Sequence, residues 1–299
     1  MNLNSIKSIL TLRYDYTQIP TLPRLKWEDL EKQKEFSVED ISNHLTSHMY
    51  KQIPENYSGP ISISLSGGVD SSLALCLLKQ NFPENQIDAI SIKFSDSTDE
   101  TETASKIAKK VGVDHHIIEI DNFLEKLSDA ISITKLPFWD IHWIYVAENA
   151  KNFSNYLVSG DGGDELFGGY IFRYSKFLSK INSNSSPKDK IQAYLSCHER
   201  DHIPEQENIF DKKMQFNWKD IYDKLYPFFN NPLSPIEQVF LADYNGKLLY
   251  NFSIINNSIA KHFNLNSVTP LLSHKIIQKS MKIPTIQKYD SSSNIGKLP

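Results

Sequence analysis

The sequence predicts an α/β fold in which a parallel sheet is flanked by helices, followed by a mostly helical C-terminal part. Between residues 60 and 170, short stretches typical of strands, which are apolar or alternate between apolar and polar residues, are followed by longer stretches with helical periodicity. Strands that alternate with helices along a chain favour a parallel sheet with helices on both faces. After residue 170 the helical patterns continue to about residue 284 without further strand-like stretches.

The individual elements follow from this pattern. Strands are predicted at 61–65, 88–94, 115–120 and 155–159. Helices are predicted in this region at 71–81, 99–111, 121–133 and 141–152. In the C-terminal part, helices are predicted at 170–182, 187–198, 218–228, 234–262 (interrupted) and 273–281. Before the first strand, Ser37 and Asp40 approximate a capping box at the start of an amphipathic helix.

Composition excludes several classes of protein. The 299 residues are 40% hydrophobic and 23% charged, as in a globular protein, and the net charge of -4 shows no basic excess that would favour a nucleic-acid partner. No apolar run approaches the roughly 18 residues of a membrane-spanning helix, and the N-terminus has no signal-peptide pattern. Two cysteines, Cys76 and Cys197, are too few for a metal cluster and fit a reducing compartment. We therefore expect a cytoplasmic protein that does not bind membranes.

Residues 66–72, Ser-Gly-Gly-Val-Asp-Ser-Ser, stand between the first predicted strand and the following helix. Glycines let backbone N–H groups approach a ligand closely, and the N-terminus of a helix carries positive partial charge. The serine hydroxyls add donors, and Asp70 can hold a metal ion. The run predicts a phosphate-binding loop that differs from the Walker type, because no Gly-Lys-Ser/Thr follows. The alternative is an ordinary capped turn.

A second loop, residues 159–170, follows the fourth predicted strand and reads Ser-Gly-Asp-Gly-Gly-Asp-Glu-Leu-Phe-Gly-Gly-Tyr. Ligands of open parallel sheets bind beyond the carboxyl ends of the strands, so both loops are expected to face one crevice. Three carboxylates within five residues repel one another, and they would also repel a polyphosphate. We therefore expect Mg²⁺ to lie between these carboxylates and a bound polyphosphate. The alternative is a solvated acidic loop.

The first loop resembles the pyrophosphate loop of the PP-loop ATP pyrophosphatase superfamily. The second loop is similar to the C-terminal synthetase domain of glutamine-hydrolysing asparagine synthetases and their β-lactam synthetase relatives. Residues 90–94, the pair Asp99-Glu100 and residues 112–116 also resemble segments of this family. The resemblance implies an adenine nucleotide alpha hydrolase-like fold of the HUP type. It further implies an N-terminal extension (1–55), an ATP pyrophosphatase core (56–180) and a helical part of the same synthetase domain (181–299).

The activity implied by the resemblance is that of an ATP-dependent, AMP-forming amide synthetase with ATP and Mg²⁺ as cofactors. A carboxylate, aspartate by default, attacks the α-phosphate, pyrophosphate leaves, and ammonia captures the acyl-adenylate. About 55 residues precede the phosphate loop, and the chain begins Met1-Asn2 rather than with the cysteine of a glutaminase domain. We therefore expect ammonia to come from solution, from a separate glutaminase subunit, or to be replaced by another amine. Assembly into a homo-oligomer is compatible with the resemblance.

Site residues are carried over from the family position by position. The resemblance assigns catalytic roles to Asp161, in assisting ammonia attack, and to Lys297, near the phosphates. It assigns Mg²⁺ to Asp70 and Asp164, and a structural or helix-start role to Glu165. The residues expected to bind ATP are Leu65, Ser66, Gly67, Gly68, Asp70, Ser71, Ser72, Ile92, Ser159 and Gly160.

Other parts of the chain depart from the family or stay ambiguous. Charged residues of two later family motifs are replaced, and the positions now read Asn257-Ser258, Asn266, Val268 and Ser273 around a retained Pro270. The family's next lysine beyond Lys297 has no counterpart. The pair His115-His116 permits a metal-binding interpretation, although adjacent strand residues point to opposite faces. The aromatic-rich segment 139–143, which includes Asp140, is expected either to line a wall of the crevice or to pack in the core.

Two other functions therefore stay open from the sequence. The first is a catalytically reduced nucleotide-binding protein or subunit, which the replaced charges would favour. The second is another PP-loop enzyme that modifies tRNA or a sugar, against which the acidic glycine-rich loop argues.

Overall fold

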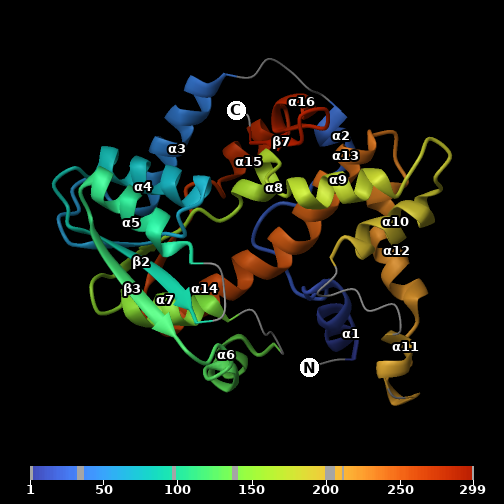
Figure 1. The fold of residues 1–299 in the computed structure, drawn as a ribbon, viewed down its shortest axis with the longest axis horizontal. Helices are drawn as coiled ribbons and strands as arrows, with labels where there is room; N and C mark the ends of the chain where they lie inside the picture. Colours follow the sequence, from blue (N-terminus) through green and yellow to red (C-terminus); the bar gives the residue numbers. More distant parts are fainter. Residues whose placement is uncertain are drawn as a thin grey trace. The chain divides into compact units, whose positions relative to one another are not determined.

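The computed structural model describes residues 3–31, 37–95, 99–136, 141–198, 206–210 and 212–297. The chain divides into two compact units, whose elements are labelled in Figure 1. We call Ser37–Gly162 with Ile255–Ile276 the sheet unit. We call Met1–Phe36, Gly163–Ile254 and Ile277–Pro299 the helical unit.

The sheet unit is built on five parallel strands in the order β3-β2-β1-β4-β5. Their bounds are β1 Ile61–Ser64, β2 Ile87–Phe94, β3 Asp114–Ile120, β4 Tyr156–Val158 and β5 Asn266–Val268. The predicted parallel sheet is thus confirmed, and the four predicted strands agree with β1 to β4 to within a residue at each end. β5 was not predicted, because three residues are too few to show a period of two.

Helices cover both faces of this sheet. Their bounds in this part of the chain are α3 Val38–Gln52, α4 Val69–Asn81, α5 Thr101–Val111, α6 Leu127–Thr134 and α7 His142–Ala150. In Figure 1, α4 and α5 lie on one side of β2 and β3, and α7 lies on the other side. α5 packs on β2 and β3, and α7 packs on β1, β2 and β4. The strand order reverses between β1 and β4, and at such a switch point the carboxyl ends of neighbouring strands leave a crevice for ligands.

Capping explains where α3 begins. The Ser37 side chain accepts a hydrogen bond from the Asp40 N–H, as the sequence predicts. Ile41, Leu45 and Met49 line the buried face of α3, at intervals of four residues. This face packs α3 beside α4, the helix that follows the phosphate loop.

The helical unit contains most of the remaining elements. They are α1 Leu3–Leu12, α2 Trp27–Glu31, α8 Gly163–Phe167, α9 Ile171–Ser179, α10 Pro187–Ser196, α11 Gln206–Ile209, α12 Trp218–Phe229, α13 Pro235–Asp243, α16 Thr285–Lys288, and the antiparallel pair β6 Tyr289–Asp290 and β7 Ile295–Gly296. α14 (Ser253–His262) and α15 (His274–Ser280) have residues in both units. None of the described helices has the length and apolar character needed to cross a bilayer.

The predicted interruption of the helix at 234–262 is confirmed. α13 starts with a capping box, in which Ser234 and Glu237 satisfy each other's backbone N–H groups. It ends at Asp243, and a π-helical stretch, Tyr244–Phe252, connects it to α14. The wider turn of a π-helix changes which side chains share a face, and such stretches are frequent near functional sites.

Candidate active site

The phosphate loop has a compact conformation set by its own small residues. Gly67 has φ +78°, in the left-handed region that favours glycine, and Gly68 is the N-cap of α4. The Ser66 and Ser71 hydroxyls lie 3.1 Å apart, and the Gly68 N–H donates to the Ser66 hydroxyl at 3.3 Å. The Ser72 hydroxyl donates to the Gly68 carbonyl oxygen at 2.7 Å. The loop therefore gathers hydroxyl and N–H groups at the first turn of α4.

The loop after β4 touches this phosphate loop directly, within the sheet unit. A Cβ atom at Gly160 would lie 2.6 Å from the carbonyl carbon of Asp70 and 2.7 Å from the amide nitrogen of Ser71. Real Cβ atoms do not approach backbone this closely. Glycine at position 160 is therefore what allows the loops after two neighbouring strands to meet.

A cavity of about 210 Å³ opens beside the phosphate loop. The ends of β1 and β2 contribute Leu65, Ser66 and Ile92, which are three of the residues predicted to bind ATP. His142, at the start of α7, also lines the cavity. Ligand sites usually measure roughly 300–1,000 Å³, so this space suits one part of a nucleotide, such as its base.

Asp161 is held by residues that are distant in the sequence. Its Oδ2 accepts hydrogen bonds from the Ser159 hydroxyl at 2.9 Å and from Asn256 Nδ2 at 2.7 Å. Burial raises the pKa of the Asp161 carboxyl, and the hydrogen bonds from Asn256 and Ser159 together with nearby His142 partly oppose this. Asn256 was not among the predicted site residues. Its only sequence signal is an amide among the buried residues Ile255 and Ile259 of α14.

Replacing Asn256 with leucine is expected to raise the pKa of Asp161 further, because a donor to the ionised carboxylate is lost. If Asp161 acts in its ionised form, the acid limb of the pH–rate profile for ATP-dependent pyrophosphate release moves to higher pH. The matched control is Asn266→Ala, which removes an exposed amide that bonds Asn155 instead. An acid limb that stays in place in Asn256→Leu would contradict this role.

Asp164 and Lys297 form an ion pair within the helical unit. Lys297 Nζ lies 2.7 Å from Asp164 Oδ1, and both side chains crowd Gly169 so closely that a Cβ atom there would clash with them. The Lys297 N–H donates to the carbonyl oxygen of Lys288 at 2.9 Å, which fixes the lysine backbone beside α16. The lysine and the second acid predicted for the site therefore come together from positions 133 residues apart in the chain.

The predicted metal ligands belong to different units. Asp70 is in the sheet unit and Asp164 in the helical unit, and the boundary falls between Gly162 and Gly163 inside the acidic loop. Among the described residues, no group of three or more His, Cys, Asp or Glu side chains is arranged to hold a metal ion. Mg²⁺ commonly binds through one or two carboxylates plus substrate phosphates, and Asp70 and Asp164 each offer a carboxylate of this kind. The Asp70–Asp164 pair stays a prediction.

Glu165 belongs to a buried polar cluster in the helical unit. Burial raises the pKa of Glu165 to about 7, while nearby Lys247 and a hydrogen bond from the Tyr170 hydroxyl act in the opposite direction. Lys247 comes from the π-helical stretch, with its Nζ 5.2 Å from the centre of the Tyr170 ring. The cluster links α8 to that stretch, which agrees with the structural role expected for Glu165.

The histidine pair on β3 does not form a shared site. His115 contacts the hydroxyls of Ser91 and Ser105 at 2.7 and 3.0 Å. His116 Nε2 lies 2.8 Å from Asp88 Oδ1. The two rings have different partners, as expected for adjacent residues of a strand. Trp139 and Asp140 lie outside the described residues, whereas Trp143 is part of the buried core.

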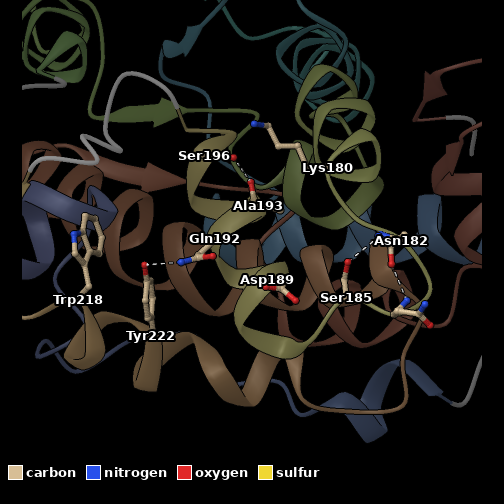
Figure 2. A pocket seen from close by; sticks show the side chains of 10 residues that line it. Lys180, Asn182, Ser185, Asp189, Gln192, Ala193, Ser196, Trp218 and Tyr222 are labelled. Carbon is tan, nitrogen blue, oxygen red and sulfur yellow. Dashed lines mark hydrogen bonds between the residues drawn. The ribbon is translucent and has the colours of Figure 1, made fainter.

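A larger cavity, of about 830 Å³, lies in the helical unit between α10 and α12. Figure 2 shows Trp218 and Tyr222 on one side of it and Asn182 and Ser185 on the other. The Gln192 amide donates to the Tyr222 hydroxyl at 3.5 Å. None of its described lining residues belongs to the predicted site, which surrounds the smaller cavity beside the phosphate loop.

A parallel sheet with a glycine- and serine-rich loop at its switch point defines a class of phosphate-binding α/β proteins. The model of the family described as "Asparagine synthase" matches residues 57–298, and the chain belongs to this family. The family resemblance found in the sequence is thereby confirmed.

Individual relatives match over shorter stretches. A putative asparagine synthetase [glutamine-hydrolyzing] 2 of Methanocaldococcus jannaschii is 33% identical over 155 residues, covering 46% of this chain and 30% of the relative. Asparagine synthetase [glutamine-hydrolyzing] 1 of Bacillus subtilis is 30% identical over 145 residues, covering 46% and 23%. The matched stretch thus spans less than a third of either relative. An NH₃-dependent NAD synthetase structure from Campylobacter jejuni is 16% identical with a TM-score of 0.36, covering 67% of this chain and 99% of that one.

Proposed function

We propose that this chain is an ATP-dependent, AMP-forming amide synthetase of the asparagine synthetase type. The observation that carries the proposal is the contact between the two loops of the sheet unit. The loop after β1 presents N–H and hydroxyl donors at the start of α4, and the loop after β4 packs against it through Gly160. One residue later, that second loop holds the Asp161 carboxylate near His142, which lines the adjoining cavity.

Each step of the reaction has a group suited to it. A substrate carboxylate oxygen attacks the α-phosphorus of ATP, and the bond to pyrophosphate breaks. The N–H and hydroxyl groups of residues 66–72 stabilise the charge that develops on the leaving pyrophosphate. Asp70 and Asp164 would hold Mg²⁺, which neutralises phosphate charge when bound. Lys297, paired with Asp164, would add a cation beside the same phosphates.

The second step forms the amide. Ammonia nitrogen attacks the acyl carbon, the bond to AMP breaks, and the nitrogen loses a proton. Asp161 would accept this proton, and its raised pKa suits a base because it brings the carboxyl closer to neutral pH. Aspartate is the first candidate for the carboxylate, since relatives are named asparagine synthetases. Their names also include glutamine hydrolysis, so ammonia released from glutamine is one candidate source and free ammonia is the other.

The decisive test is pyrophosphate release from ATP and Mg²⁺ in the presence of aspartate and ammonium, which bypasses the ammonia source. We expect release that requires both substrates, a product identified by mass spectrometry, and loss of release in Asp70→Ala. Binding of ATP without pyrophosphate release across a panel of amino-acid carboxylates would contradict the proposal and favour a nucleotide-binding protein without catalysis.

A further inference from the structure

A second cavity of the sheet unit has an unusual set of lining groups. It measures about 360 Å³ and lies between α3 and the residues at the start of α15. α3 contributes His44, His48 and Lys51, and the start of α15 contributes His274 and Lys275. The other described lining residues are one asparagine and two serines. Among the described residues no carboxylate lines the cavity itself, although that of Asp40 lies nearby, with its Oδ1 3.3 Å from His44 Nδ1. Every described lining side chain can therefore donate a hydrogen bond or carry positive charge.

The geometry of α3 explains this concentration. His44, His48 and Lys51 follow one another at intervals of four and three residues, so they share one face of the helix. Ile41, Leu45 and Met49 form the buried face of α3. The face with His44, His48 and Lys51 adjoins it, because seven residues separate Ile41 from His48 and seven residues make nearly two full turns.

His48 supplies an independent observation. Its Nε2 atom is buried and has no hydrogen-bond partner among the described residues. Burial and nearby Lys51 both lower the pKa of His48, which favours the neutral ring. A buried polar atom without a partner is unfavourable, and a turn of the His48 ring that brought Nε2 to the cavity surface would let a ligand atom accept its hydrogen bond.

We propose that this cavity binds a small polyvalent anion of the phosphate class, separately from the phosphate loop. Two ammonium groups around one cavity complement negative charge, and the three imidazoles can donate N–H hydrogen bonds to phosphate oxygens. The volume falls within the range of small-molecule sites, which favours a compact ligand over a macromolecule. α3 packs beside α4, whose first turn is the phosphate loop. One of the two segments that line the cavity is therefore packed against the helix that the first loop opens.

A metal ion is the competing occupant, since His44 and His48 are four residues apart on a helix. No metal-binding group of three or more His, Cys, Asp or Glu side chains exists within the described ranges. The Nδ1 atom of His44 is also engaged, at 2.7 Å from the carbonyl oxygen of Asp40. An anion uses the two lysines, whereas a metal ion would be repelled by them.

Histidine resonances can report the two phosphate-binding places separately. The whole chain is titrated with inorganic tripolyphosphate at constant ionic strength while the ¹H–¹³C ring signals of its nine histidines are followed. His48 and His274 report the new cavity, and His142 reports the cavity beside the phosphate loop. We expect saturable shifts of His48 and His274.

The double variant Lys51→Gln/Lys275→Gln is expected to weaken the affinity measured at His48 and His274 by about tenfold, with the His142 response unchanged. Lys79→Gln is the matched control, because it removes an exposed lysine of α4 that bonds the Pro83 carbonyl oxygen, and it should change neither response. The proposal is overturned if tripolyphosphate shifts His142 alone, if the double variant binds as the wild type does, or if Zn²⁺ perturbs His48 and His274 while tripolyphosphate does not.

Discussion

Replacing Gly160 with alanine is expected to lower ATP-dependent pyrophosphate release by at least about 100-fold. The added Cβ atom would lie 2.6 Å from the Asp70 carbonyl carbon and 2.7 Å from the Ser71 nitrogen. Both are backbone atoms in the first turn of α4, so they cannot rotate away as a side chain would. The loops after β1 and β4 must then separate by about 1 Å, and a displacement of this size between reacting groups costs about two orders of magnitude in rate. Initial rates and the ATP dissociation constant of the variant measure the effect.

Gly112→Ala is the control within the same unit. Gly112 has φ +75°, but a Cβ atom there meets nothing within 4 Å. This variant should lose roughly 1–2 kcal/mol of stability through backbone strain and bind ATP as the wild type does. A Gly160→Ala protein with the wild-type rate would show that the two loops do not need to touch for catalysis.

The largest expected effect on stability comes from replacing Lys288 with methionine. Lys288 is 2% exposed in the helical unit, and burial lowers its pKa to about 7, while Glu237 acts in the opposite direction. The pKa in the unfolded chain is 10.5. The folded state therefore binds the proton less tightly than the unfolded state does, and charging Lys288 destabilises the fold. This destabilisation is complete below pH 7, decreases as the pH rises from 7 to 10.5, and is absent above that range.

The size of the effect follows from the two pKa values. A difference of about 3.5 units corresponds to about 5 kcal/mol. The Nζ atom lies 5.4 Å from the centre of the Phe240 ring, and this contact favours the charged form by about 1–2 kcal/mol. Lys288→Met is therefore expected to raise the free energy of unfolding by about 3 kcal/mol at pH 6 and by less than about 1 kcal/mol at pH 10.5.

Urea unfolding at both pH values tests this expectation. The control is Lys282→Met, because Lys282 is exposed and its replacement should change stability by less than about 0.5 kcal/mol. A Lys288→Met protein that is less stable than the wild type at pH 6 would mean that the charged amine contributes favourably to the folded state.

Most strands of the sheet could be predicted from the sequence. β1 to β4 were predicted because each is a short apolar or alternating stretch that ends at glycine, serine or acidic residues. The helix predicted at 121–133 begins only at Leu127, because turns occupy the preceding residues. β5 and the strand order depend on pairing between Val158 and Val268, which lie 110 residues apart.

The candidate site divides in the same way. The donors of residues 66–72 act within a single turn of the chain, so local sequence predicts their role. The partners of Asp161 and Glu165, in contrast, come from distant parts of the chain, so local sequence does not predict them. Asn256 reaches Asp161 across 95 positions. Lys247 interacts with Glu165 from the π-helical stretch Tyr244–Phe252, and no local sequence pattern predicts a π-helix there.

The parallel α/β class, the phosphate loop and the family can be read from the order of neighbouring residues alone. The packing of Gly160 on the Asp70 backbone, the hydrogen bond from Asn256 to Asp161, and the cavity beside His44, His48 and Lys51 of α3 are visible only in the folded chain. These features depend on which distant segments pack together, and that is set by the burial of apolar faces throughout each unit rather than by any local pattern.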